Sequence, residues 1–145
     1  MKNFINLQYI FSYLGLIPYI LIVIDKFFIF FISKEIMLSF NIYYTLLIIV
    51  FVGAINWNLQ ENISSNIIIY GFLPSLFSVI IISLHLYLFN SFYLLLMIML
   101  ALLMQLIFDY IFIYRDALNK KVFYFVRLPL TFLIVLNLIF IKFQL

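Results

Sequence analysis

Five long apolar runs, separated by short polar loops, constrain this chain more than any single motif does. Each run is close to the about 20 apolar residues that an α-helix needs to cross a bilayer. We place the spans at residues 7–24, 40–59, 67–86, 91–114 and 122–141. The rest of the chain is enough for short loops and too little for a soluble domain. The runs therefore predict one transmembrane domain over residues 1–145 with an all-α fold, an integral membrane bundle of five transmembrane helices.

The composition agrees with a bilayer as the natural solvent. Hydrophobic residues make up 69% of the chain and charged residues 9%, whereas soluble domains have roughly 45–50% and about 25%. The eight Lys and Arg residues are scattered at span ends and form no basic patch, so we expect no nucleic-acid partner. The sequence has no cysteine, which excludes disulfides, thiolate metal sites, iron–sulfur clusters and thiol nucleophiles.

Lys and Arg also predict the orientation of the spans. With five spans, the N-terminus and the loops after the second and fourth spans share one side of the membrane. On or near that side lie Lys2, Arg115, Lys120, Lys121 and Arg127, and on the opposite side lie Lys26, Lys34 and Lys142. Because cytoplasmic loops carry the excess of Lys and Arg, we expect the N-terminus inside and the C-terminus outside. Residues 27–32 are apolar but too few to span, and we place them at the interface.

The second span carries a polar face in an apolar run. Gly53, Asn56, Trp57 and Gln60 are spaced at i, i+3, i+4 and i+7, which is one face of one helix. Such a face must meet something other than lipid. Two interpretations remain open: a packing surface with Trp57 as an interfacial anchor, or a surface that contacts a ligand.

Most other polar residues within the spans fall in the same leaflet as this face. They are Ser75 in the third span, Gln105 and Asp109 in the fourth, and Arg127 and Thr131 in the fifth. Exposing these groups to lipid would leave donors and acceptors unpaired, at a cost of several kcal/mol per group. We therefore expect them to converge, together with Asn56, Trp57 and Gln60, on one pocket.

Asp109 and Arg127 form the sharpest part of this pattern. They lie at equal distances from Leu118, the middle of the loop between the fourth and fifth spans. In a helical hairpin this spacing brings them to the same depth, about 6–8 Å below the span ends. A charge in a span costs ~2.5–3.5 kcal/mol and normally has a partner, so we expect an ion pair. The pair is either a structural link or part of a ligand or proton site, and Arg127 alone is also long enough to snorkel to the interface.

The sequence offers no arrangement for catalysis. A metal site needs several convergent ligands, and Glu61, His85 and Asp109 lie too far apart along the spans to converge. The single histidine, His85, is placed on the side opposite Asp109, which excludes a Ser–His–Asp set. There is no glycine-rich phosphate loop. We expect a protein that is not an enzyme and that has no metal and no cofactor.

Short motifs in a fixed order resemble a known family. They are Leu14-Gly15-Leu16-Ile17-Pro18-Tyr19, Phe51-Val52-Gly53-Ala54-Ile55-Asn56-Trp57, Tyr70-Gly71-Phe72-Leu73-Pro74-Ser75, Gln105-Leu106-Ile107-Phe108-Asp109 and Arg127-Leu128-Pro129-Leu130-Thr131. Their order is similar to that of the transmembrane-protein-69-like family, five-span proteins of bacteria and mitochondria with a domain of unknown function. Where the family pattern reads Gly-Gly-x-His-Trp-Gly, this chain has Asn56 and Asn58 at the His and last Gly positions. The resemblance implies a bacterial or mitochondrial inner membrane and supplies no activity.

Three functions fit these observations. The first is a non-enzymatic inner-membrane protein whose one-leaflet polar pocket binds a small amphiphile, either a lipid head group or a quinone-like molecule. The second is an accessory or assembly subunit of an inner-membrane complex, in which the polar face meets a partner membrane protein. The third is a small transporter, which the odd span count and the absence of inverted repeats weaken.

Overall fold

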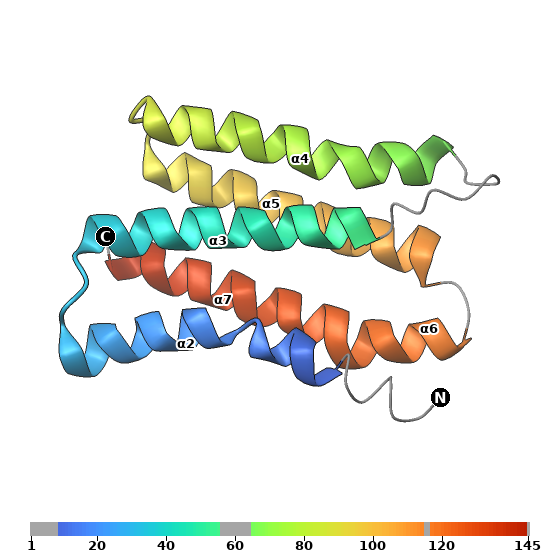
Figure 1. Ribbon diagram of the computed structural model, residues 1–145, viewed down its shortest axis with the longest axis horizontal. Coiled ribbons are helices and arrows are strands. Elements are labelled where there is room, and N and C mark those ends of the chain that lie inside the picture. Colours follow the sequence, from blue (N-terminus) through green and yellow to red (C-terminus); the bar gives the residue numbers. More distant parts are fainter. Residues whose placement is uncertain (1–8, 56–64, 115–116, 145) are drawn as a thin grey trace. The chain divides into compact units, whose positions relative to one another are not determined.

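The computed structural model describes residues 9–55, 65–114 and 117–144, which are helical apart from short turns (Figure 1). No strand occurs within these ranges. After helical residues 9–14, the elements are α2 (Ile17–Ile24), η1 (Asp25–Ile29), α3 (Lys34–Ile55), α4 (Ser65–Leu86), α5 (Ser91–Phe108), η2 (Asp109–Ile113), α6 (Ala117–Val122), η3 (Phe123–Arg127) and α7 (Leu128–Gln144), where η denotes a π-helix.

Five helical stretches among the described residues are long and apolar enough to cross a membrane. They are Tyr9–Ile29, Lys34–Ile55, Ser65–Leu86, Ser91–Ile113 and Lys120–Phe143. Every one of them exposes large apolar side chains, for example Leu47 of α3 and Phe132 of α7. Soluble proteins rarely expose such continuous apolar surface, whereas lipid is a good solvent for it. The predicted fold class, an all-α bundle of five membrane-spanning helices, is confirmed.

The first span is longer than the sequence suggested. We expected it to end at Ile24, but π-helix η1 continues it to Ile29, and Phe30 then adopts a left-handed conformation with φ of 55°. Asp25 does not end the helix because it is buried and has local partners. Its carboxylate oxygens accept hydrogen bonds from the backbone N–H groups of Phe31 and Ile32, at 3.3 and 3.0 Å. Because the carboxylate accepts hydrogen bonds from two backbone N–H groups that follow the span, a buried Asp25 is compatible with a span that continues past it.

Helix α3 begins earlier than the second span that we expected from residue 40. It starts at Lys34, because Ser33 provides an N-terminal cap. The Ser33 hydroxyl accepts a hydrogen bond from the N–H of Ile36 at 3.4 Å, and the Ser33 carbonyl accepts one from the N–H of Met37 at 3.0 Å. Serine is among the preferred residues at this position because its oxygen satisfies an otherwise unpaired helix donor.

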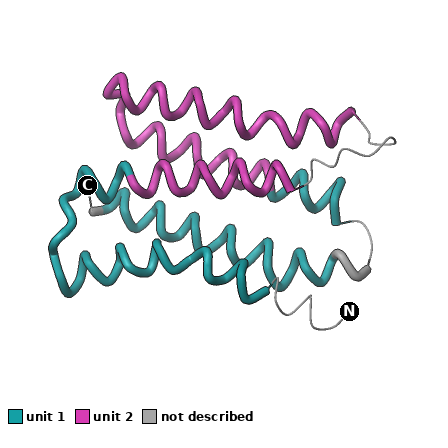
Figure 2. Tube along the Cα trace, viewed as in Figure 1, with its two compact units in different colours: residues 1–39, 106–145 teal, residues 40–105 magenta. Residues whose placement is uncertain are grey.

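The chain divides into two compact units (Figure 2). Unit 1 comprises residues 1–39 and 106–145, and unit 2 comprises residues 40–105. In unit 1, the ring of Phe27 contacts that of Phe140, with centroids 5.6 Å apart, and the hydroxyl of Tyr13 donates to the carbonyl of Phe125 at 2.5 Å. These contacts join the first span to the fifth. The single-domain expectation stays a prediction.

In unit 2, helices α3 and α4 approach closely at Gly53. A Cβ atom at Gly53 would lie 2.7 Å from Cγ of Pro74 and 3.3 Å from the carbonyl oxygen of Gly71. Real Cβ atoms do not tolerate the first distance, so this contact requires a glycine. Small residues at helix contacts are typical of membrane proteins, where they allow backbones to pack tightly without a hydrophobic driving force.

Candidate functional site

Asp109 and Arg127 are in direct contact in unit 1. Asp109 is the first residue of η2 and Arg127 is the last residue of η3. Arg127 Nε donates to Asp109 Oδ2 at 2.5 Å, and the two residues are 8% and 1% exposed. The structure therefore contains the ion pair that the hairpin spacing predicts. Among the described residues Arg127 is the only buried cation.

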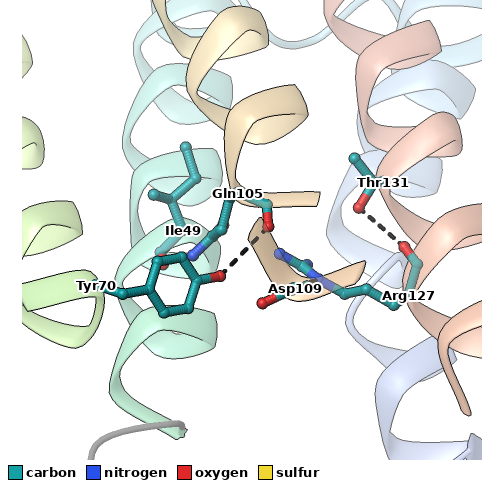
Figure 3. A network of polar contacts seen from close by, with 6 residues as sticks. All are labelled: Ile49, Tyr70, Gln105, Asp109, Arg127 and Thr131. Carbon is teal, nitrogen blue, oxygen red and sulfur yellow. Dashed lines mark hydrogen bonds and ion pairs between the residues drawn. The ribbon is translucent and has the colours of Figure 1, made fainter. Parts of the chain in front are cut away.

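Of the two parallel N–H groups on one edge of the Arg127 guanidinium, only the one on Nε donates to Asp109. A side-on Arg–carboxylate pair would use two parallel N–H groups, but here Arg127 Nη2 is buried and has no hydrogen-bond partner among the described residues. Thr131 contacts the backbone of Arg127 instead: its hydroxyl donates to the carbonyl of Arg127, one turn back, at 2.9 Å (Figure 3). A buried donor without a partner is costly, and this one belongs to a cation.

Tyr114 adds a phenol next to the pair. Its backbone N–H closes η2 by donating to the carbonyl of Asp109 at 3.0 Å, and the residue follows the last position of the fourth span, Ile113. Burial raises the pKa of Tyr114 above its ordinary value, the Asp109 carboxylate raises it further, and the Arg127 guanidinium lowers it. The phenol is therefore neutral at physiological pH and adds no charge to the pair.

Gln105 has partners within unit 2. Its side-chain Nε2 donates to the carbonyl of Ile49 on α3 at 2.9 Å. Its own carbonyl accepts a long hydrogen bond of 3.4 Å from the hydroxyl of Tyr70 on α4 (Figure 3). Gln105 Oε1 is buried and has no partner among the described residues. This amide thus connects the three helices of unit 2 and leaves one acceptor unused.

Sequence reasoning missed Tyr70 and Asp25. Tyr70 is one of 11 tyrosines in the sequence, yet it lies on the same buried face of α4 as Gly71, Pro74 and Ser78. That spacing is the signal that could have found it. Asp25 directly follows the predicted end of the first span, and nothing in its neighbours along the sequence distinguishes a buried acid from an interfacial one.

The remaining predicted site residues are half-buried or lie outside the described residues. Ser75 is half-buried on α4, whereas Ser78, one turn later, is buried and donates to the carbonyl of Pro74 at 2.8 Å. Asn56, Trp57 and Gln60 lie outside the described residues. Tyr70 and Gln105 belong to unit 2, and Asp109, Arg127 and Thr131 belong to unit 1. The expected convergence of all these residues on one pocket stays a prediction.

The described residues contain no group of three or more His, Asp and Glu that could hold a metal ion. The resemblance to the transmembrane-protein-69-like family stays a prediction. Comparison with models of protein families, with curated proteins and with solved structures found no match.

Proposed function

We propose that this chain is a non-enzymatic, multi-pass inner-membrane protein that binds a small amphiphile, either a lipid head group or a quinone, at polar residues within its spans. The observation that carries the proposal is the buried Nη2 of Arg127, which has no hydrogen-bond partner in the part of the chain that the structure describes. Charged residues within spans are rare and expensive, and they usually mark a substrate or ligand path. An Arg–carboxylate pair that served only as a structural link would be expected to use both parallel N–H groups of the guanidinium, on Nε and on Nη2.

Recognition would begin at the guanidinium. Its Nη2 group holds donors in fixed directions, and an oxygen of the amphiphile that reached it would remove the cost of a buried donor without a partner. Thr131 and Asp109 keep the rest of Arg127 in place, through the carbonyl and through Nε respectively. The guanidinium is therefore oriented before a ligand arrives, which reduces the entropy cost of binding.

Copurification tests this proposal. Wild-type protein purified from native membranes in a mild detergent should carry a specific amphiphile that lipid mass spectrometry identifies. The double variant Asp109→Asn/Arg127→Gln removes both charges together, so no charge is left buried alone, and it should lose that molecule. Lys121→Gln is the matched control, since Lys121 is exposed in the same candidate span and its loss should change nothing.

The same purification separates the proposal from its main alternative. If the amphiphile profile is identical in the wild type and the double variant, the ion pair does not bind a ligand. A stoichiometric membrane protein that copurifies with the wild type and is lost in the double variant would instead establish an accessory or assembly subunit.

A further inference from the structure

The charges around Arg127 indicate which kind of oxygen would accept a hydrogen bond from its Nη2 group, which has no partner among the described residues. Resting on the proposed function, we infer that the bound group is a neutral carbonyl oxygen of an amphiphile and not an anionic phosphate. The carbonyl of a quinone ring and the ester carbonyl of a lipid share this chemistry. The inference thus narrows the ligand from the two classes proposed above to those with an uncharged acceptor.

The first step is charge balance. Arg127 and Asp109 are in contact at 2.5 Å and both are buried, so the positive charge of the guanidinium is already compensated. A neutral carbonyl would add no charge to this pair. A phosphate would add negative charge next to the Asp109 carboxylate, whose repulsion would oppose the attraction to Arg127, and the cost of removing the phosphate from water would remain.

The second step is that the described residues include no other buried cation. Phosphate sites gather several charged or backbone donors around the anion. Lys120 and Lys121 are exposed on α6, and Lys26 and Lys142 are half-buried, whereas Arg127 is the only buried cation that the structure describes. The nearby Tyr114 phenol is neutral. Nothing described in unit 1 is positioned to balance an additional negative charge at this depth.

The third step is the stereochemistry of the guanidinium. Nε and Nη2 present parallel N–H groups on one edge, and Asp109 occupies only the Nε position. The remaining donor is sufficient for one lone pair of a carbonyl oxygen, whereas a phosphate normally takes both parallel donors. Asp109 thus stands where the second phosphate oxygen would lie.

Binding by native mass spectrometry tests the inference on the full-length protein in a detergent that has neither carbonyl nor phosphate. The probes are decylubiquinone, monolaurin and dodecyl phosphate, which present a quinone carbonyl, an ester carbonyl and a phosphate on similar alkyl chains. Wild type should bind at least one carbonyl probe about tenfold or more tightly than dodecyl phosphate. The tighter of the two carbonyl probes identifies the source of the oxygen.

Asp109→Asn provides the second arm, because it removes the compensating charge and retains an acceptor for Nε. This variant should gain affinity for dodecyl phosphate by about tenfold or more. If Asp109→Asn prefers the carbonyl probes over dodecyl phosphate as strongly as wild type does, the charge argument is overturned. If the variant does not fold, the relative affinities of wild type for the three probes decide alone. Tighter binding of dodecyl phosphate to wild type would overturn the inference and leave the proposed function standing. If no probe binds the wild type, the proposed function fails as well.

Discussion

A double-mutant cycle on Asp109 and Arg127 tests the structural basis of the site most directly. The changes are Asp109→Asn, Arg127→Gln and their combination, which keep the size of each side chain close to the original. Both residues are buried, so each single variant leaves a charge in the protein interior without its partner. Breaking a buried pair by removing one member costs about 3–5 kcal/mol.

The geometry places this pair at the lower end of that range. One hydrogen bond joins the residues, from Nε to Oδ2, and Nη2 has no partner in the described structure to lose. We therefore expect each single variant to lower the free energy of unfolding by about 3 kcal/mol. The double variant removes both charges and should lose less than either single variant, since replacing a buried pair as a whole is often close to neutral.

The free energy of unfolding can be measured by titrating a strong anionic detergent into mild-detergent micelles and following helicity. The expected coupling energy between the two positions is about 3 kcal/mol or more, which is at the upper end for residues in contact. Lys121→Gln, an exposed cation of the same span, should change stability by no more than about 0.5 kcal/mol. Additive single effects would refute the reasoning, because they would mean that neither charge depends on the other.

Three further predictions concern other parts of the chain. Gly53→Ala should destabilise unit 2 by about 1–3 kcal/mol, since the added methyl would lie 2.7 Å from Cγ of Pro74. The control Ala54→Leu, at an exposed position, should not destabilise it, and equal melting temperatures of Gly53→Ala and wild type would contradict the close approach. Asp25→Ala should cost about 1–3 kcal/mol, because it leaves two backbone donors without their carboxylate, and Asp25→Asn should restore part of the loss. An alkaline phosphatase fusion at the C-terminus should be active and one near Lys120 inactive, and the reverse pattern would invert the orientation.

The spans and the ion pair were accessible from sequence because both follow from one-dimensional rules. Span length follows from the thickness of the bilayer, and the pairing of Asp109 with Arg127 follows from equal distances to the loop centre. Burying an isolated charge in lipid is expensive enough that a partner at the same depth is nearly obligatory. No knowledge of the packing between helices was needed for either prediction.

The details that sequence reasoning missed depend on local geometry. Whether Asp25 ends a span is decided by the N–H groups of Phe31 and Ile32, which its carboxylate reaches only because the backbone turns at Phe30. The hydrogen bond from Tyr70 to Gln105 joins residues far apart in sequence, and periodicity along one helix says nothing about its neighbour. That Arg127 pairs through Nε while its Nη2 has no partner among the described residues is likewise a matter of side-chain orientation.

The three π-helices have a consequence for how this sequence can change over evolution. Each buried charge in the described structure, Asp25, Asp109 and Arg127, lies in one of these segments. A π-helix closes i→i+5 hydrogen bonds and so accommodates one residue more than an α-helical turn. Deleting one residue there restores regular α-helical winding while the flanking helix keeps nearly the same face toward its neighbours, because the wider π turn had absorbed the extra residue. Related chains are therefore expected to differ by single-residue gaps at these points, and an alignment without gaps would place their charges one position away from those of this chain.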